Sequence, residues 1–142
     1  MGRFTYYSPM LGGFALAALM HDTIWASSPI KLNENLHWVV VFLVGLSWAI
    51  AFQLLMVGSQ GLFAQVLPVP GGRSIRGGMA VLGGALIWLF VLSTSIARLL
   101  AGEQLKWVPT AMGVVGLLAA IGAVICYVWG WPTAVRDFAD RK

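Results

Sequence analysis

Long apolar runs dominate the chain, and short segments rich in proline, glycine or charge separate them. A helix needs about 20 mostly apolar residues to cross the hydrocarbon core of a membrane. Runs of about that length cover residues 9–27, 37–58, 78–97 and 107–131. Because the segments between them are typical of turns, the pattern predicts four transmembrane helices joined by short loops.

The first run supports a span least strongly, because it contains His21 and Asp22. Its purely apolar part, residues 10–20, has the length of a signal-peptide core. Small residues typical of a cleavage site occupy 26–28, but Pro29 follows them and disfavours cleavage. We therefore expect residues 9–27 to be retained as a true span.

The second run keeps an apolar character beyond residue 58, as far as Leu67. Ser59, Gln60 and Gln65 interrupt this extension, which is the pattern of an amphipathic, interfacial helix end. We expect one long, tilted helix that can extend to residue 67 and that ends at Pro68.

Small residues recur at four-residue spacing in each run, and such stripes let helix backbones approach closely in lipid. One face of the first run carries Gly13, Ala17 and His21, and one face of the second carries Gly45, Ala49 and Gln53. The later runs contribute the pairs Ala80 and Gly84, Gly116 and Ala120, and Ala119 and Ala123. Together with the run lengths, the stripes predict an antiparallel helical bundle.

Composition supports a single membrane domain over residues 1–142, with the bilayer as its main contact. Hydrophobic residues make up 59% of the chain and charged residues 10%, whereas soluble domains carry about 25% charged residues. The net charge of +4 is spread over the edges of the apolar runs, which argues against nucleic-acid binding. The fold class expected is an all-α membrane protein.

The distribution of lysine and arginine predicts the orientation of the bundle. The N-terminus, the segment between the second and third runs and the C-terminal tail hold six of the nine basic residues. The positive-inside bias places both termini in the cytoplasm, and we expect a bacterial-type inner (plasma) membrane. The first group is Arg3, Arg73, Arg76, Arg136, Arg141 and Lys142, and the other group is Lys31, Arg98 and Lys106.

His21, Asp22 and His37 are the first candidates for chemistry. An ionisable group inside a span costs a few kcal/mol on insertion scales, so His21 and Asp22 need a reason to be there. One interpretation places His21 in the bundle interior, against a haem or quinone, with Asp22 orienting it and His37 facing it across the first hairpin. The other places them near the outer interface, in reach of water. No cofactor or metal is expected, and haem b is the option left open.

Gln53 and Gln60 are seven residues apart and share a helix face. They either line a path for a solute or a proton, or make hydrogen bonds between helices that stabilise packing by about 1 kcal/mol each. Ser93, Thr94 and Ser95 are expected to bond back to carbonyls of their own helix.

The segment 70–78 contains four glycines around Arg73 and Arg76. Two arginines next to a membrane can contact anionic lipid headgroups. The segment lacks the Lys-Ser/Thr ending of a nucleotide-binding loop, so nucleotide binding is not expected.

The sequence contains no nucleophile elbow, zinc-ligand spacing or paired intramembrane carboxylates, so we expect a protein that is not an enzyme. The first functional hypothesis is a small subunit that packs into or stabilises a larger membrane complex of respiratory, photosynthetic or transport type. Two alternatives remain: a small oligomeric transporter or channel, and a haem- or quinone-binding electron-transfer subunit. The expected partners are other membrane subunits or further copies of this chain.

Overall fold

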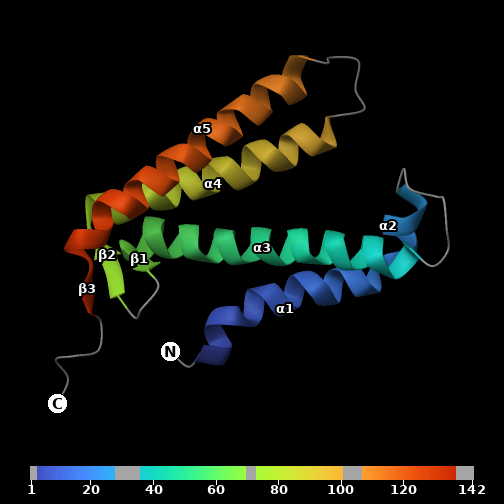
Figure 1. The fold of residues 1–142 in the computed structure, drawn as a ribbon, viewed down its shortest axis with the longest axis horizontal. Coiled ribbons are helices and arrows are strands. Elements are labelled where there is room, and N and C mark those ends of the chain that lie inside the picture. Colours follow the sequence, from blue (N-terminus) through green and yellow to red (C-terminus); the bar gives the residue numbers. More distant parts are fainter. Residues whose placement is uncertain (1–2, 28–35, 70–72, 101–106, 137–142) are drawn as a thin grey trace. The chain divides into compact units, whose positions relative to one another are not determined.

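The computed structural model describes residues 3–27, 36–69, 73–100 and 107–136. The described residues are mostly helical, with one small sheet (Figure 1). The chain divides into two compact units, Met1–Gln53 and Leu54–Lys142, so that helix α3 begins in the first and ends in the second. In chain order the elements are α1 (Arg3–Leu19), α2 (His21–Ser27), α3 (His37–Ala64), β1 (Val66–Val69), β2 (Arg73–Arg76), α4 (Gly78–Leu99), α5 (Trp107–Gly130), η2 (Trp131–Thr133) and β3 (Val135–Arg136).

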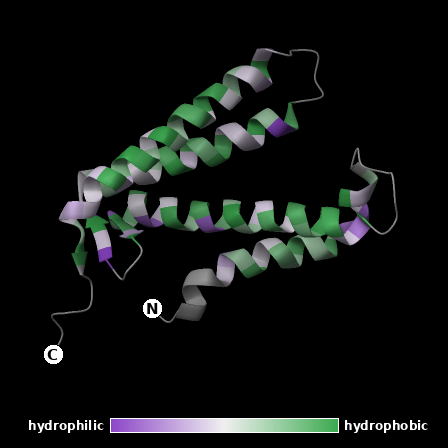
Figure 2. Ribbon diagram, viewed as in Figure 1, coloured by the Kyte–Doolittle hydropathy of each residue, from purple (hydrophilic) through white to green (hydrophobic). Residues whose placement is uncertain are grey.

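Three helical segments are long and apolar enough to cross a membrane: His37–Ala64, Gly78–Leu99 and Trp107–Thr133. Figure 2 shows their largely hydrophobic ribbons. Only a minority of each span's apolar window is buried within the protein, 17%, 33% and 22% in chain order. These spans therefore leave apolar surface for contact with the lipid bilayer.

The first predicted span, 9–27, is divided into α1 and α2 at Met20. Its long apolar stretch in the structure, Ser8–Leu19, is shorter than the other three. Hydrogen bonds of helical spacing nevertheless continue through the break, since Met20 N donates to Leu16 O and Ile24 N donates to Met20 O, both at 3.0 Å. The segment is a bent helix rather than two separate ones.

In the first unit, α1 packs against the first half of α3 through the predicted small-residue stripes. A Cβ added to Gly13 would lie 2.6 Å from Ala49 Cα, and one added to Gly45 would lie 3.1 Å from Ala17 Cβ. Because later residues of α1 meet earlier residues of α3, the two helices run antiparallel. The prediction of a close approach through these residues is confirmed.

In the second unit, the end of α3 and the start of α4 make backbone contact. A Cβ on Gly84 would lie 2.6 Å from the carbonyl oxygen of Gly58 and 3.0 Å from the carbonyl carbon of Gly61. Ala80, one turn before Gly84, is fully buried. This close approach depends on three glycines, two on α3 and one on α4.

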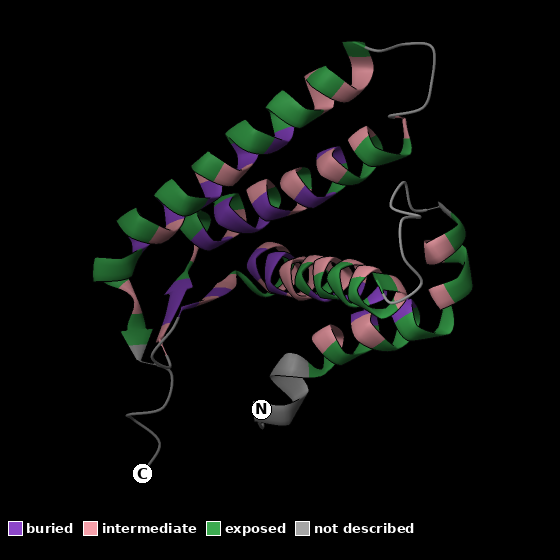
Figure 3. Cartoon of the chain, turned by 45° about the vertical axis from the view of Figure 1, so that its right-hand side comes forward, coloured by how far each residue is buried: buried purple, intermediate pink, exposed green. Residues whose placement is uncertain are grey.

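Helices α4 and α5 form an antiparallel hairpin within the second unit (Figure 1). Gly116 lies against Ser93 and Thr94 near one end, and Cys126 lies against Gly83 near the other. The face of α5 turned toward α4 is buried, and the opposite face is exposed (Figure 3). The buried residues of α5 are Gly116, Ala119, Ala123, Cys126 and Gly130, which include three of the four small residues predicted to pack.

The small three-stranded antiparallel sheet corrects the all-α prediction. Strand β2 pairs with β1 and with β3, in the order β1-β2-β3. Helix α3 continues past residue 58 as expected, but it ends at Ala64, so its predicted extension to residue 67 is wrong. Gln65 has a φ of 54°, which ends the helix in a left-handed conformation, and the β-branched Val66 and Val69 then start and finish strand β1. The predicted short loop is a β-hairpin instead.

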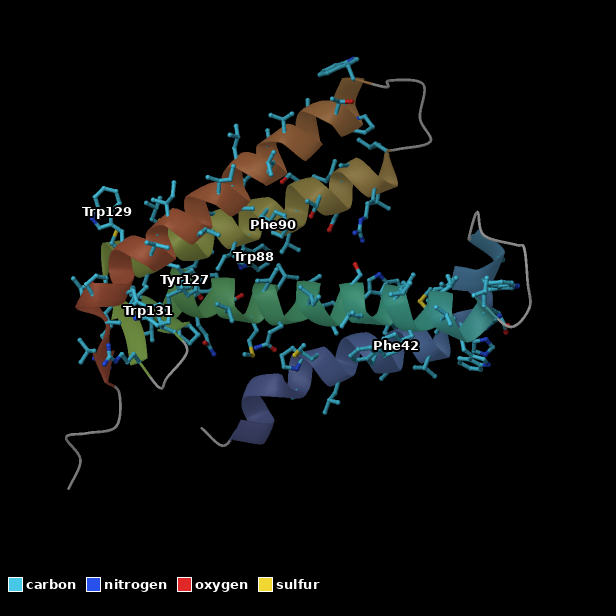
Figure 4. All side chains as sticks on the ribbon, viewed as in Figure 1. Phe42, Trp88, Phe90, Tyr127, Trp129 and Trp131 are labelled. Carbon is cyan, nitrogen blue, oxygen red and sulfur yellow. The ribbon has the colours of Figure 1, made fainter. Side chains whose placement is uncertain are left out.

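Buried aliphatic side chains hold the sheet against the ends of the helices. Leu67 contacts Gly61 and Gly83, and Ile75 lies so close to Gly130 that a Cβ there would meet its Cδ1 at 2.6 Å. Tyr127 on α5 donates its hydroxyl to the carbonyl oxygen of Pro68 at 3.1 Å, and Figure 4 shows this ring beside the sheet. The sheet therefore joins α3, α4 and α5 at one end.

Candidate functional site

Two histidines and two tryptophans form an aromatic cluster at the junction of α2 and α3. The ring centroids of His21 and His37 lie 5.4 Å apart in an edge-on contact. Trp38 lies 5.4 Å from His21, and Trp25 lies 5.0 Å from His37. The structure thus brings together the two imidazoles that the sequence suggested could meet, and it adds an indole beside each.

Asp22 accompanies His21 but does not complete a hydrogen-bonded pair. Its Oδ1 lies 3.1 Å from His21 Nδ1, yet that nitrogen is buried and has no hydrogen-bond partner, so the two atoms are adjacent without being aligned. The Asp22 side chain is 90% exposed, against 36% for His21. Asp22 therefore faces outward, as consecutive helical residues diverge, and it does not occupy the bundle interior.

In this arrangement the two imidazoles lie closer together than the two ligands of one haem iron would. Two imidazoles that bind opposite faces of one iron, each through a bond of about 2 Å, keep their centroids roughly 6 Å apart. The 5.4 Å found here is shorter, and the rings touch each other directly. Within the described ranges, no group of three or more His, Cys, Asp or Glu side chains lies in a position to hold a metal ion. The geometry favours ring packing over haem ligation.

Gln53 has an unusual environment within α3. Its side-chain oxygen and nitrogen, Oε1 and Nε2, are both buried and neither has a hydrogen-bond partner among the described residues. A buried amide without hydrogen-bond partners lowers the stability of the folded state by about 1–3 kcal/mol, because its hydrogen bonds to water are lost and not replaced. A glutamine at the surface keeps those hydrogen bonds. Gln60 is half-buried in the second unit. Of the two glutamines proposed to line a path, Gln53 is the one whose polar side-chain atoms are buried without a partner among the described residues.

The hydroxyl groups of Ser59 on α3 and of the serine–threonine cluster on α4 bond to carbonyls of their own helices. Ser59 Oγ donates to Leu55 O at 2.7 Å and accepts a hydrogen bond from Trp88 Nε1 at 3.3 Å. The prediction for the serine–threonine cluster is confirmed, because each of its hydroxyls bonds to a carbonyl of α4. Ser93 bonds to Leu89, Thr94 bonds to Phe90 at 2.7 Å, and Ser95 bonds to Val91 at 2.7 Å.

Arg73 and Arg76, the candidate lipid contacts, are the two ends of strand β2. Successive strand residues face opposite sides of a sheet, so residues three apart do not share a face. The register places Arg136 of β3 directly opposite Arg73. Contact of Arg73 and Arg76 with lipid headgroups stays a prediction.

Two features of these sites were missed from the sequence. Trp25 and Trp38 occur near predicted span ends, where tryptophan is common, and nothing in their spacing indicates contact with the histidines. The pairing of Arg73 with Arg136 joins segments about sixty residues apart, and a two-residue strand carries no readable alternation.

The three long apolar helices define the class of this molecule as a multi-pass membrane protein in contact with the lipid bilayer. No family model, curated protein or solved structure matches the chain.

Proposed function

We propose that this chain is a small, non-catalytic membrane subunit that packs into or stabilises a larger membrane complex. The observation that carries the proposal is the way polar groups are used in the second unit. The serine and threonine hydroxyls of α4 donate hydrogen bonds to carbonyl oxygens of their own helix, and the helices contact one another through glycine and alanine. Side chains used in this way hold helices together and offer little to a passing solute.

The exposed face of α5 supports the same proposal. From Val114 to Trp129 its exposed large side chains are hydrophobic, and this face suits lipid or the apolar surface of another membrane subunit. Figure 4 shows Trp129 pointing away from the helices. A close-packed interior with an apolar outer face is expected of a subunit that binds other membrane subunits and has no catalytic role.

The proposed topology has four spans, with α1 and α2 together forming the first. From Arg3 to Ser27 this bent segment has 25 residues, which at about 1.5 Å each is long enough to cross the hydrocarbon core. Both termini then lie on one side, and the basic residues of the sheet favour the cytoplasmic side of a bacterial-type inner membrane.

A partner subunit is tested by gentle detergent extraction at native expression level, followed by sizing and mass spectrometry of the same peak. We expect co-eluting membrane proteins in a fixed ratio to this chain. A peak that contains this chain alone, as a folded homo-oligomer, would contradict the proposal. A visible spectrum of that peak also tests the electron-transfer alternative, because bound haem b absorbs strongly near the blue end of the spectrum.

A transporter remains the second candidate because the Gln53 amide is buried without partners among the described residues. The variant Gln53→Leu separates the two functions. If Gln53 only packs, the variant should be as stable as the wild type, or its free energy of unfolding should rise by about 1–3 kcal/mol. The partner subunits should still co-elute with the chain.

If Gln53 lines a path, Gln53→Leu should abolish flux in reconstituted vesicles while the chain stays folded. Gln60→Leu removes the second glutamine proposed for the path and should reduce flux as well. Absence of any flux for the wild-type chain as a folded homo-oligomer would exclude the transporter.

A further inference from the structure

The two histidines of the aromatic cluster join α2 to α3 through rings whose charge depends on pH. His21 is the first residue of α2 and His37 is the first residue of α3, and their ring centroids lie 5.4 Å apart. Histidine ordinarily gains its proton between about pH 8 and pH 5. Two neutral rings pack at this distance, whereas two imidazolium ions repel each other. The contact between α2 and α3 therefore depends on how many protons the pair carries.

The surroundings of the pair accommodate one positive charge. Trp38 lies 5.4 Å from His21 and Trp25 lies 5.0 Å from His37, measured between ring centroids. An aromatic ring attracts a cation within about 6 Å of its centre. Oδ1 of Asp22 lies 3.1 Å from Nδ1 of His21 and is attracted to a positive charge on that ring. A single proton on the cluster thus does not oppose its packing, and a second proton does.

Few other charges act on the two rings. Between Ser8 and Gln53, the acidic, basic and histidine side chains that the structure describes are His21, Asp22 and His37. Asp22 follows His21 on α2, so it stays beside that ring whether or not α2 contacts α3, and it contributes little to the contact itself. Lys31 and Glu34 belong to residues 28–35, which lie outside the described residues, and substitution tests their influence below.

We propose that His21 and His37 form a pH-sensitive switch, closed while at most one ring is protonated and open when both are. The contact is then complete at neutral pH and is lost as the pH falls. Opening also gives water access to Nδ1 of His21, which is buried without a hydrogen-bond partner in the closed cluster. Because a buried nitrogen without a partner destabilises the closed form, a modest repulsion is enough to open it.

The switch is tested on the full-length chain in an uncharged detergent, with spin labels on α2 and α3. The labels are attached at Ala26→Cys and Val39→Cys, both exposed positions, after Cys126→Ala removes the native thiol. At about pH 8 we expect one short distance between the labels, and at about pH 5 a second, longer one. The ratio of open to closed molecules should rise about tenfold, as expected for two like charges at this spacing near water. An unchanged ratio would overturn the switch.

Variants that keep an aromatic ring but cannot be protonated separate charge from packing. His21→Phe and His37→Phe should each keep the short distance at about pH 5, because a single charge has no partner to repel. If both variants open as the wild type does, repulsion between the histidines is not the cause and the proposal is wrong. If a phenylalanine variant does not fold, His21→Gln or His37→Gln replaces it in the same comparison.

Control measurements distinguish the switch from acid unfolding of the whole chain. Labels at Leu89→Cys on α4 and Leu118→Cys on α5, both exposed, should report one distance over the same pH range. A change in that distance at the pH of opening would mean general unfolding and would overturn the switch. Opening should persist in Lys31→Gln, Glu34→Gln and Asp22→Asn, and its loss in any of these variants would assign the pH response to a group outside the histidine pair.

Discussion

Gly84→Ala should destabilise the protein by about 2–3 kcal/mol, although it adds a single methyl group. That methyl would lie 2.6 Å from the carbonyl oxygen of Gly58 and 2.8 Å from the amide nitrogen of Leu62. Both atoms belong to the backbone of α3, so no side chain can move aside and the two helices must separate. The free energy of unfolding in mixed micelles measures the effect.

Gly113→Ala is the matched control for this change, because it adds the same methyl at an exposed position of α5. A Cβ at Gly113 meets nothing within 4 Å. Its stability should lie within about 1 kcal/mol of the wild type, on the stabilising side, since alanine favours helix more than glycine does. Equal effects of the two variants would contradict the backbone contact between α3 and α4.

Gly13→Ala is the corresponding change in the first unit and should have the second-largest effect, also about 2 kcal/mol or more. Its methyl would lie 2.6 Å from Ala49 Cα and 2.8 Å from the carbonyl carbon of Trp48, which again are backbone atoms. Because α1 and α3 cannot keep their spacing, we expect a lower unfolding midpoint, followed by tryptophan fluorescence.

The neighbouring residue provides a sharp control for that variant. Gly12→Ala adds the same methyl one position away, where nothing lies within 4 Å. If Gly12→Ala and Gly13→Ala behave alike, α1 does not pack against α3 through this face.

Helix positions could be predicted well from the sequence because lipid imposes a simple rule. A span must be apolar over its whole length, and that property is local and readable in runs such as 78–97 and 107–131. The packing faces were readable too, since small residues at four-residue spacing, such as Gly13 and Ala17, fix which side of a helix allows close contact.

The sheet could not be predicted, because its strands gain stability only from partners far away in the chain. In the sequence, residues 66–67 look like a continuation of an apolar helix that ends at Pro68. In the structure, Gln65 has a left-handed conformation, and segment 66–69 pairs with β2 and accepts the hydrogen bond of Tyr127 at Pro68. The same limit applies to Arg136, whose position opposite Arg73 depends on that pairing. The contacts of Trp25 and Trp38 with the two histidines could not be predicted either, because they join residues of α2 and α3 across a turn in the chain.

The topology of the chain is tested most directly by placing reporters of membrane sidedness at Met1 and at Lys142. Four spans, with α1 and α2 as the first crossing, require both reporters on the same side, and the basic residues predict that this side is the cytoplasm. Reporters on opposite sides would mean that only the three long helices cross the membrane, and would contradict the four-span bundle.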